Sequence, residues 1–212
     1  LTHIEKKWYI CNMNIPDTGN IKWSENVIVA DADYVDKVAF DLTVNFERMI
    51  GRRIPPADMS QWAVCVALDG GLRPGKHETQ VVLIHDRKNP KMENFAPGTY
   101  ATELDGQAFD DPQMGEFTFA DVATGEFAGN DVTMLDVLRN LLGHSEVKRI
   151  MLIPDETNGE LIETLRNTLR DANDEQRITL LAMQPLVGGN YRQEILGYSL
   201  MRALGIDSNE IK

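Results

Sequence analysis

Five side chains of this sequence have the types and spacing to do chemistry together. Four are carboxylates that follow short apolar runs typical of buried strands, and the fifth is a histidine at the end of such a run: Asp31, Asp33, Asp86, Asp155 and His85. Carboxylate oxygens bind Mg²⁺ or Mn²⁺, and a bound cation polarises phosphoryl oxygens. The histidine could serve as a general base. The pattern predicts a divalent-metal-dependent phosphoesterase or nuclease.

A structural interpretation of the same residues competes with the catalytic one. Asp33 and Asp155 stand near the expected starts of helices, where a carboxylate caps backbone N–H groups and is favoured by the helix dipole. Asp31 and Asp86 have no obvious capping position, and a lone histidine at the end of a strand is more often structural. Several carboxylates repel one another without a metal, so convergence in one cleft would favour the metal site.

A glycine-rich turn is a second candidate site. Gly188, Gly189 and Asn190 precede a helix that we expect over residues 191–204. Backbone N–H groups at a helix N-terminus bind phosphate, so this turn is a candidate anion-binding site. It matches neither the dinucleotide-binding nor the P-loop fingerprint, and an ordinary tight turn is the commoner explanation.

Basic residues gather in three places, which are Arg52-Arg53, Arg73 with Lys76, and Arg87-Lys88 with Lys91. At one common edge they could bind a phosphate or an acidic partner. Scattered, solvated loops are the more ordinary explanation. No motif of a covalent hydrolase is present, which argues against an acyl-enzyme mechanism.

The elements that must position these residues alternate regularly along the chain. Five apolar runs predict strands: residues 26–31, 80–86, 116–121, 149–153 and 178–183. Helical periodicity between them implies right-handed crossovers and a mainly parallel sheet. We therefore expect an α/β fold, a three-layer Rossmann-like sandwich of about five strands with helices on both faces. Ligands of such sheets bind at the carboxyl ends of the strands.

Local signals predict where two helices begin and end. Asp33 is expected to cap a first helix, and Gly51 to end it in the left-handed conformation. Residues 58–71 could form a strand by composition alone. However, Asp58 and Gln61 have the capping-box spacing, which favours a helix.

The rest of the chain contains a long segment without periodicity and a further capping pair. Residues 87–111 are polar, contain proline and show no periodicity, which predicts a long excursion loop. Asn190 and Gln193 repeat the capping-box spacing and predict the start of the final helix.

Length and composition are those of an ordinary globular protein. The 212 residues are 42% hydrophobic and 25% charged, and we expect a poorly determined N-terminal extension over 1–24 and a single α/β domain over 25–212. The net charge of −12 argues against nucleic acid and anionic membranes as partners. A protein partner or a homo-oligomer stays open.

Cysteine use indicates the compartment. Cys11 and Cys65 belong to no metal or redox motif, and two free thiols fit a reducing cytoplasm. The first residues contain no apolar run of signal-peptide length, and the longest run, Trp62–Leu68, is too short to cross a bilayer. We expect a cytoplasmic protein.

Four segments carry a resemblance to a known family: Glu25–Leu42, Asn45–Pro56, Val66–Arg73 and Val147–Met151. Together they resemble an uncharacterised bacterial domain-of-unknown-function family, over most of the chain after about residue 24. The resemblance implies a stand-alone cytoplasmic bacterial protein. It implies no activity and no catalytic residues.

Two enzyme families show a more local similarity. The carboxylates at strand ends resemble those of PIN/NYN-like nucleases, and Asp31-Ala-Asp33 is similar to the Asp-x-Asp opening of haloacid-dehalogenase phosphatases. The phosphatase pattern breaks at Asp86, where Ser or Thr should end the second strand. We therefore expect a non-catalytic binding or regulatory module, with a Mg²⁺- or Mn²⁺-dependent phosphoesterase or nuclease as the alternative.

Overall fold

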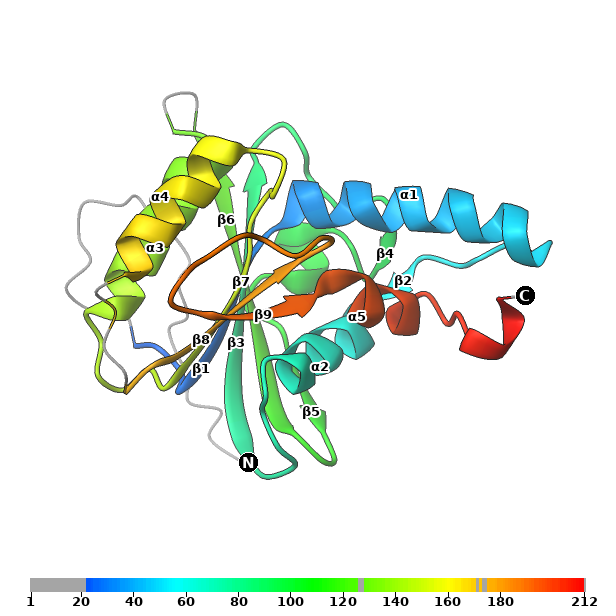
Figure 1. Cartoon of the computed structure of the whole chain (residues 1–212). Helices are drawn as coiled ribbons and strands as arrows, with labels where there is room; N and C mark the ends of the chain where they lie inside the picture. Colours follow the sequence, from blue (N-terminus) through cyan, green and yellow to red (C-terminus); the bar gives the residue numbers. More distant parts are fainter. Residues whose placement is uncertain (1–21, 126–127, 171, 173–174, 212) are drawn as a thin grey trace, which may run out of the picture.

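A mixed α/β fold built on one large sheet contains most of the chain (Figure 1). The computed structural model describes residues 22–125, 128–170, 172 and 175–211. The sheet has seven strands in the order β5-β6-β3-β1-β7-β8-β9. Their bounds are β1 Asn26–Asp31, β3 His77–Asp86, β5 Ala108–Asp111, β6 Gly115–Thr124, β7 Arg149–Ile153, β8 Arg177–Ala182 and β9 Arg192–Ile195. All neighbours pair in parallel except β5, which is antiparallel to β6.

The strand order reverses beside β1. The chain runs outward from β1 to β3 and β6, returns to pair β7 with the other side of β1, and continues outward to β8 and β9. All six residues of β1 are buried, because this strand has neighbours on both sides and packing on both faces. Its β-branched run is the composition that such a strand needs.

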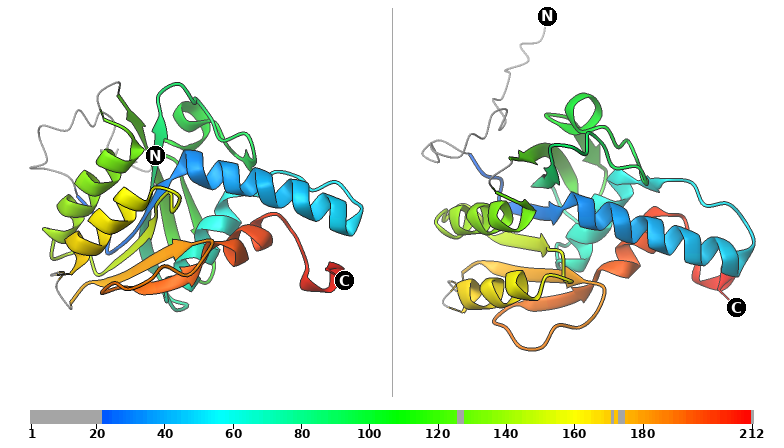
Figure 2. Two further views of the ribbon diagram at one scale, coloured as in Figure 1. Left: turned by 45° about the horizontal axis from the view of Figure 1, so that its top comes forward. Right: turned by 90° about the horizontal axis from the view of Figure 1, so that it is seen from above.

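Helices pack on the sheet in two groups (Figure 2). Their bounds are α1 Ala32–Ile50, α2 Met59–Asp69, α3 Asn130–Leu142, α4 Gly159–Leu169 and α5 Leu196–Ala203. Alternate residues of a strand point to opposite faces. Ile28 and Ala30 of β1 therefore join a core with α1, α2 and α5, whereas Val27 and Val29 join a second core with α3 and α4.

Helix α1 extends beyond the sheet. Its fully buried positions end at Ala39, and the second half projects away from the strands (Figures 1 and 2). It ends at Gly51 with a φ of 71°, which confirms the predicted left-handed stop. Arg52 then pairs with Glu210 at 2.8 Å and donates to the Gly205 carbonyl, so the C-terminal segment holds the end of this helix.

The segment with two competing predictions is helical. Helix α2 occupies most of residues 58–71, and Asp58 Oδ1 accepts a hydrogen bond from the Gln61 backbone N–H at 2.9 Å. The capping signal was decisive because the apolar run alone fits a strand and a helix equally well.

The sheet has seven strands rather than about five, and the two additional ones are its edges. β5 lies in the predicted loop 87–111, which also contains β4 Phe95–Ala96 and a π-helix at Tyr100–Leu104. β4 pairs with β2 Ala57–Asp58 in a separate small sheet. The loop prediction was wrong because elements of two to five residues are too short to show periodicity.

The start of the final helix was also predicted wrongly. Residues 192–195 form β9, and only Leu196–Ala203 is helical. Gln193 does not form a capping box, since its side chain bonds the backbone N–H and carbonyl of Leu186 at 2.8 and 2.7 Å. Pairing of β9 with β8 is a long-range contact that local spacing does not report.

Three sequence expectations concern the ends and the compartment. Cys11 and most of the 1–24 extension lie outside the described residues, but Trp23 is buried and its Nε1 donates to Asn140 Oδ1 at 2.7 Å. Cys65 is a buried, free thiol. In the part of the chain that the structure describes, none of the helices combines the length and apolar character needed to cross a membrane.

The β5–β6 hairpin depends on a glycine, and this can be tested. Gly115 has a φ of +87°, and a Cβ there would lie 2.4 Å from the His77 carbonyl oxygen. We expect Gly115→Ala to lower the free energy of unfolding by at least about 1–2 kcal/mol, because an L side chain is strained at this φ. Urea unfolding followed by tryptophan fluorescence measures the change.

Gly159→Ala is the matched control. Gly159 opens α4 and has no heavy atom within 4 Å of an added Cβ, so alanine there should be neutral or stabilising. Equal unfolding midpoints for the two variants would contradict the prediction.

Candidate functional site

Three of the predicted site residues lie at the carboxyl ends of β1 and β3, namely Asp31, His85 and Asp86. Asp31 ends β1 and is the N-cap of α1, with Oδ1 accepting from the Tyr34 backbone N–H at 3.0 Å. Asp33 was expected to be this cap, but it lies inside the first turn. The difference arises because β1 passes into α1 without a loop, so the last strand residue takes the capping position.

Asn130, the first residue of α3, connects the two carboxylates. Its Nδ2 donates to Asp31 Oδ1 at 3.0 Å and to Asp33 Oδ2 at 2.9 Å, and its Oδ1 lies 3.1 Å from the Thr124 hydroxyl. The sequence interpretation did not single out Asn130. The available signal was its place directly after Gly129, at the start of a segment with helical periodicity.

Asp33 joins β1 to the turn after β3. Its Oδ2 accepts from the Asp86 backbone N–H at 2.7 Å, and its Oδ1 accepts from Asn89 Nδ2 at 2.8 Å. The Asp86 carboxylate accepts from the Lys88 backbone N–H at 2.8 Å. Both oxygens of Asp33 are thus occupied by donors from the protein, and Asp86 organises its own turn.

Asp155 organises the turn after β7. Its Oδ1 accepts from the backbone N–H and the hydroxyl of Thr157, at 2.9 and 2.6 Å. The cap of α4 is Asn158, so Asp155 does not have the capping role that the sequence suggested. Across the described ranges, no group of three or more His, Cys, Asp or Glu side chains could hold a metal ion.

The electrostatics of the edge centre on Asp31. Burial raises its pKa from 3.8 to about 6, and the charges of Asp33 and Asp155 act in the same direction. The hydrogen bonds from Tyr34 and Asn130 oppose this shift. A carboxylate at the end of a buried strand loses solvent, and these donors replace only part of that solvation.

His85 lies on the opposite side of β3 from Asp86. It is 4% exposed, stacks on Tyr100 with ring centroids 3.7 Å apart, and has Nδ1 3.0 Å from the Asp86 carbonyl. Its Nε2 lies 3.2 Å from Asp121 Oδ2. Both ring nitrogens therefore face acceptors, and both donate when the ring is protonated.

The charge of the histidine follows from these partners. Burial acts to lower the pKa of His85, but the hydrogen bonds to Asp121 and to the Asp86 carbonyl raise it above its ordinary value. The same pairing lowers the pKa of Asp121. In this geometry both ring nitrogens of His85 are already directed at protein oxygens, which leaves neither of them directed at a substrate.

A cavity of about 800 Å³ opens beside this network. It lies between the turn after β3, the end of β6 and the start of α3, and its lining residues are Asp33, Asp86, Arg87, Lys88, Asn89, Thr124, Gly125, Gly129 and Asn130. Two carboxylates and two cationic side chains share its wall. Arg87 and Lys88 belong to one of the basic clusters noted in the sequence, and here they meet the acidic residues.

The predicted anion-binding turn lies elsewhere. Gly188 and Gly189 have φ values of 76° and 120°, as a tight turn requires, and Asn190 Nδ2 lies 3.5 Å from the Arg170 carbonyl. The turn leads into β9 rather than into a helix. The helix N-terminus on which the anion-binding interpretation rested is therefore missing at this position.

Comparison with known proteins places the chain in one family. A family model described as a family of unknown function, DUF6621, matches residues 20–211. No curated protein and no solved structure matches the chain. The local resemblance to PIN/NYN-like nucleases stays a hypothesis.

The raised pKa of Asp31 predicts how stability depends on pH. Because the pKa is about 6 in the folded state and 3.8 in its ordinary state, the folded protein binds the proton more tightly. The resulting stability is complete below about pH 4 and is lost as the pH rises through 6. Asp31→Asn keeps the Oδ1 that accepts from Tyr34 and Asn130.

We expect Asp31→Asn to be more stable than the wild type at pH 7, by on the order of 1–3 kcal/mol, and equal to it near pH 4. Urea unfolding across this range measures the difference. Asp33→Asn is the comparison: it puts an amide against a donor, so it should destabilise at every pH. A difference in unfolding free energy between Asp31→Asn and wild type that stays constant across the range would refute the raised pKa of Asp31.

Proposed function

The chain belongs to DUF6621, a family of unknown function, and we propose that it is a non-catalytic binding module. Its ligand is a small zwitterion, such as a free amino acid, held in the cavity at the carboxyl edge of the sheet. One observation carries the proposal: two carboxylates and two cationic side chains line the same 800 Å³ cavity.

The position of the cavity supports a binding role. We interpret the sheet and its two helix groups as a three-layer, Rossmann-like arrangement, because the parallel strands reverse their order beside β1. Ligands of such folds bind outside the carboxyl ends of strands at this reversal. The volume also falls within the roughly 300–1,000 Å³ of small-molecule sites.

The charges indicate the chemistry of the ligand. Arg87 and Lys88 suit a carboxylate, since charge-assisted hydrogen bonds of this kind are strong. Asp86 on the same wall suits an ammonium group. A ligand with one charge of each sign leaves the cavity neutral. A ligand with a single charge would instead face like charges on the cavity wall, either the two carboxylates or the two cationic side chains.

The hydrogen-bond network supports binding without catalysis. Asp33 accepts three hydrogen bonds from the protein, and the amide of Asn130 donates to Asp31 as well. A divalent cation would have to displace these donors, since N–H groups and cations compete for the same lone pairs. The metal-dependent phosphoesterase therefore has less support as an alternative.

We also infer a cytoplasmic location. Cys65 is free and buried, and free thiols persist in a reducing compartment.

Calorimetric titration with a panel of free amino acids tests the proposal. At least one should bind the wild type saturably, and glucose, a neutral polar molecule, should not. The Arg87→Ala/Lys88→Ala variant should bind at least about tenfold more weakly, since a hydrogen bond to a charged group contributes about 1.5–3 kcal/mol. Asp86→Asn, which retains Oδ1 for the Lys88 N–H, should also weaken binding.

Arg48→Ala is the control, because Arg48 is exposed on the projecting part of α1 and away from the cavity. It should bind like the wild type. Failure of every amino acid to bind would overturn the proposal. Saturable Mn²⁺ binding that Asp31→Asn/Asp86→Asn removes would favour the phosphoesterase instead.

A further inference from the structure

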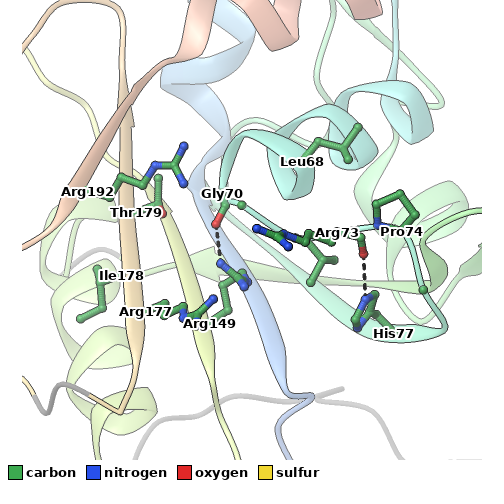
Figure 3. A pocket seen from close by; sticks show the side chains of 13 residues that line it. Leu68, Gly70, Arg73, Pro74, His77, Arg149, Arg177, Ile178, Thr179 and Arg192 are labelled. Atoms are coloured by element: carbon green, nitrogen blue, oxygen red, sulfur yellow. Dashed lines mark hydrogen bonds between the residues drawn. The ribbon is translucent and has the colours of Figure 1, made fainter.

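A second cavity, of about 980 Å³, lies at the opposite, amino end of the strands (Figure 3). The end of α2, the following loop and the first residues of β7, β8 and β9 form its wall. Four arginines line it: Arg73, Arg149, Arg177 and Arg192. In Figure 3 their guanidinium groups turn toward one space beside Gly70. This is a concentration of positive charge in a protein with a net charge of −12.

Strand register explains the convergence. Arg149 of β7 pairs with Arg177 of β8, and Arg192 of β9 pairs with Thr179 of β8. Registered partners share a face of the sheet, as do residues two apart on one strand. Arg149, Arg177 and Arg192 thus lie on one face, on three consecutive strands about 4.8 Å apart. It is the face on which Met151 of β7 joins the core of α1, α2 and α5.

Two glycines allow the guanidinium groups to approach the loop after α2. Arg149 Nη1 donates to the Gly70 carbonyl at 2.7 Å. Gly71 has a φ of +82°, and a Cβ there would lie 3.0 Å from Arg192 Nη1 and 3.3 Å from Arg149 Nη1. Two arginines from different strands therefore lie close to the same glycine, where a side chain would crowd them.

Glu25, Asp69 and Glu194 lie near this cluster, but among the described residues only Glu194 forms an ion pair with one of its arginines. Arg192 pairs with Glu194, and its Nε lies 2.8 Å from Glu194 Oε1. Neither Arg73 nor Arg177 has an ion pair with any described residue. Arg149 Nε is buried without a hydrogen-bond partner. Burial and the charges of Arg177 and Arg192 lower the pKa of Arg149, so the cluster repels itself when no anion is present.

His77 fixes the loop that carries Arg73. Its Nε2 lies 2.9 Å from the Arg73 carbonyl and its Nδ1 lies 3.1 Å from Glu25 Oε1. This contact joins the first residue of β3 to the rim of the cavity. The loop is therefore attached to the sheet, and Arg73 faces the other three arginines.

We propose that this cavity binds a small organic molecule carrying two or more phosphate groups. Guanidinium forks match phosphate oxygens in pairs, and four arginines suit more than one phosphate. Leu68, Pro74 and Ile178 provide apolar wall for the organic part. A long nucleic acid does not fit, because the net charge of −12 repels a polyanion outside the cavity. The proposal is independent of the zwitterion cavity.

Titration calorimetry of the full chain with ADP, pyrophosphate and inorganic phosphate tests this inference. ADP and pyrophosphate should bind, and inorganic phosphate should bind at least about tenfold more weakly, because it contacts fewer arginines. Arg73→Ala and Arg177→Ala should each weaken ADP binding about tenfold or more. Both residues are exposed, and unchanged circular dichroism spectra will verify that both variants fold.

Arg87→Ala/Lys88→Ala is the matched control, since it removes two positive charges at the other end of the strands and should leave ADP binding unchanged. Three outcomes would overturn the proposal. The first is no binding of ADP or pyrophosphate, the second is binding that Arg73→Ala and Arg177→Ala leave intact, and the third is loss of binding in the control. Equal affinity for phosphate and pyrophosphate would reject the requirement for two phosphates.

Discussion

Burial of β1 on both faces and both edges is the constraint on which the rest of the structure depends. Its alternate side chains enter two different cores, so helices must cover both faces of the sheet. A carboxylate at the end of this strand is removed from water, and Asp31 has to find donors within the protein. The backbone of α1 and the amide of Asn130 supply them, which brings α3 to the same edge.

The sequence was most informative where a pattern is local and long. The β-branched run of β1 and the apolar run of β3 identify central strands, and Asp58 with Gln61 identifies the start of α2. The edge strands β5 and β9 contain only four residues each, two and three of them charged or polar, and they are strands only because β6 and β8 pair with them. No local spacing contains that information.

The candidate sites also combine features that local sequence predicts with features that only long-range contacts create. Asp31, Asp33 and Asp86 were correctly expected at one edge, because strands that run in parallel end together. Their hydrogen-bond role depends on Asn130, which is 99 residues from Asp31 in the chain. The arginine cavity was missed for a similar reason. Arg149 and Arg177 each begin a strand, where a single charged residue is unremarkable, and only strand register makes them neighbours.

The two outer strands also determine how the sheet meets other molecules. An uncovered edge is a template for another strand, and proteins discourage its use by making the edge short and charged. β5 has two aspartates in four residues, and β9 has Arg192 and Glu194 in four. Neither edge invites a strand from a second copy of the chain. Self-association, and contact with a partner protein, should therefore use the helices, and concentrated protein should resist forming fibrils through this sheet.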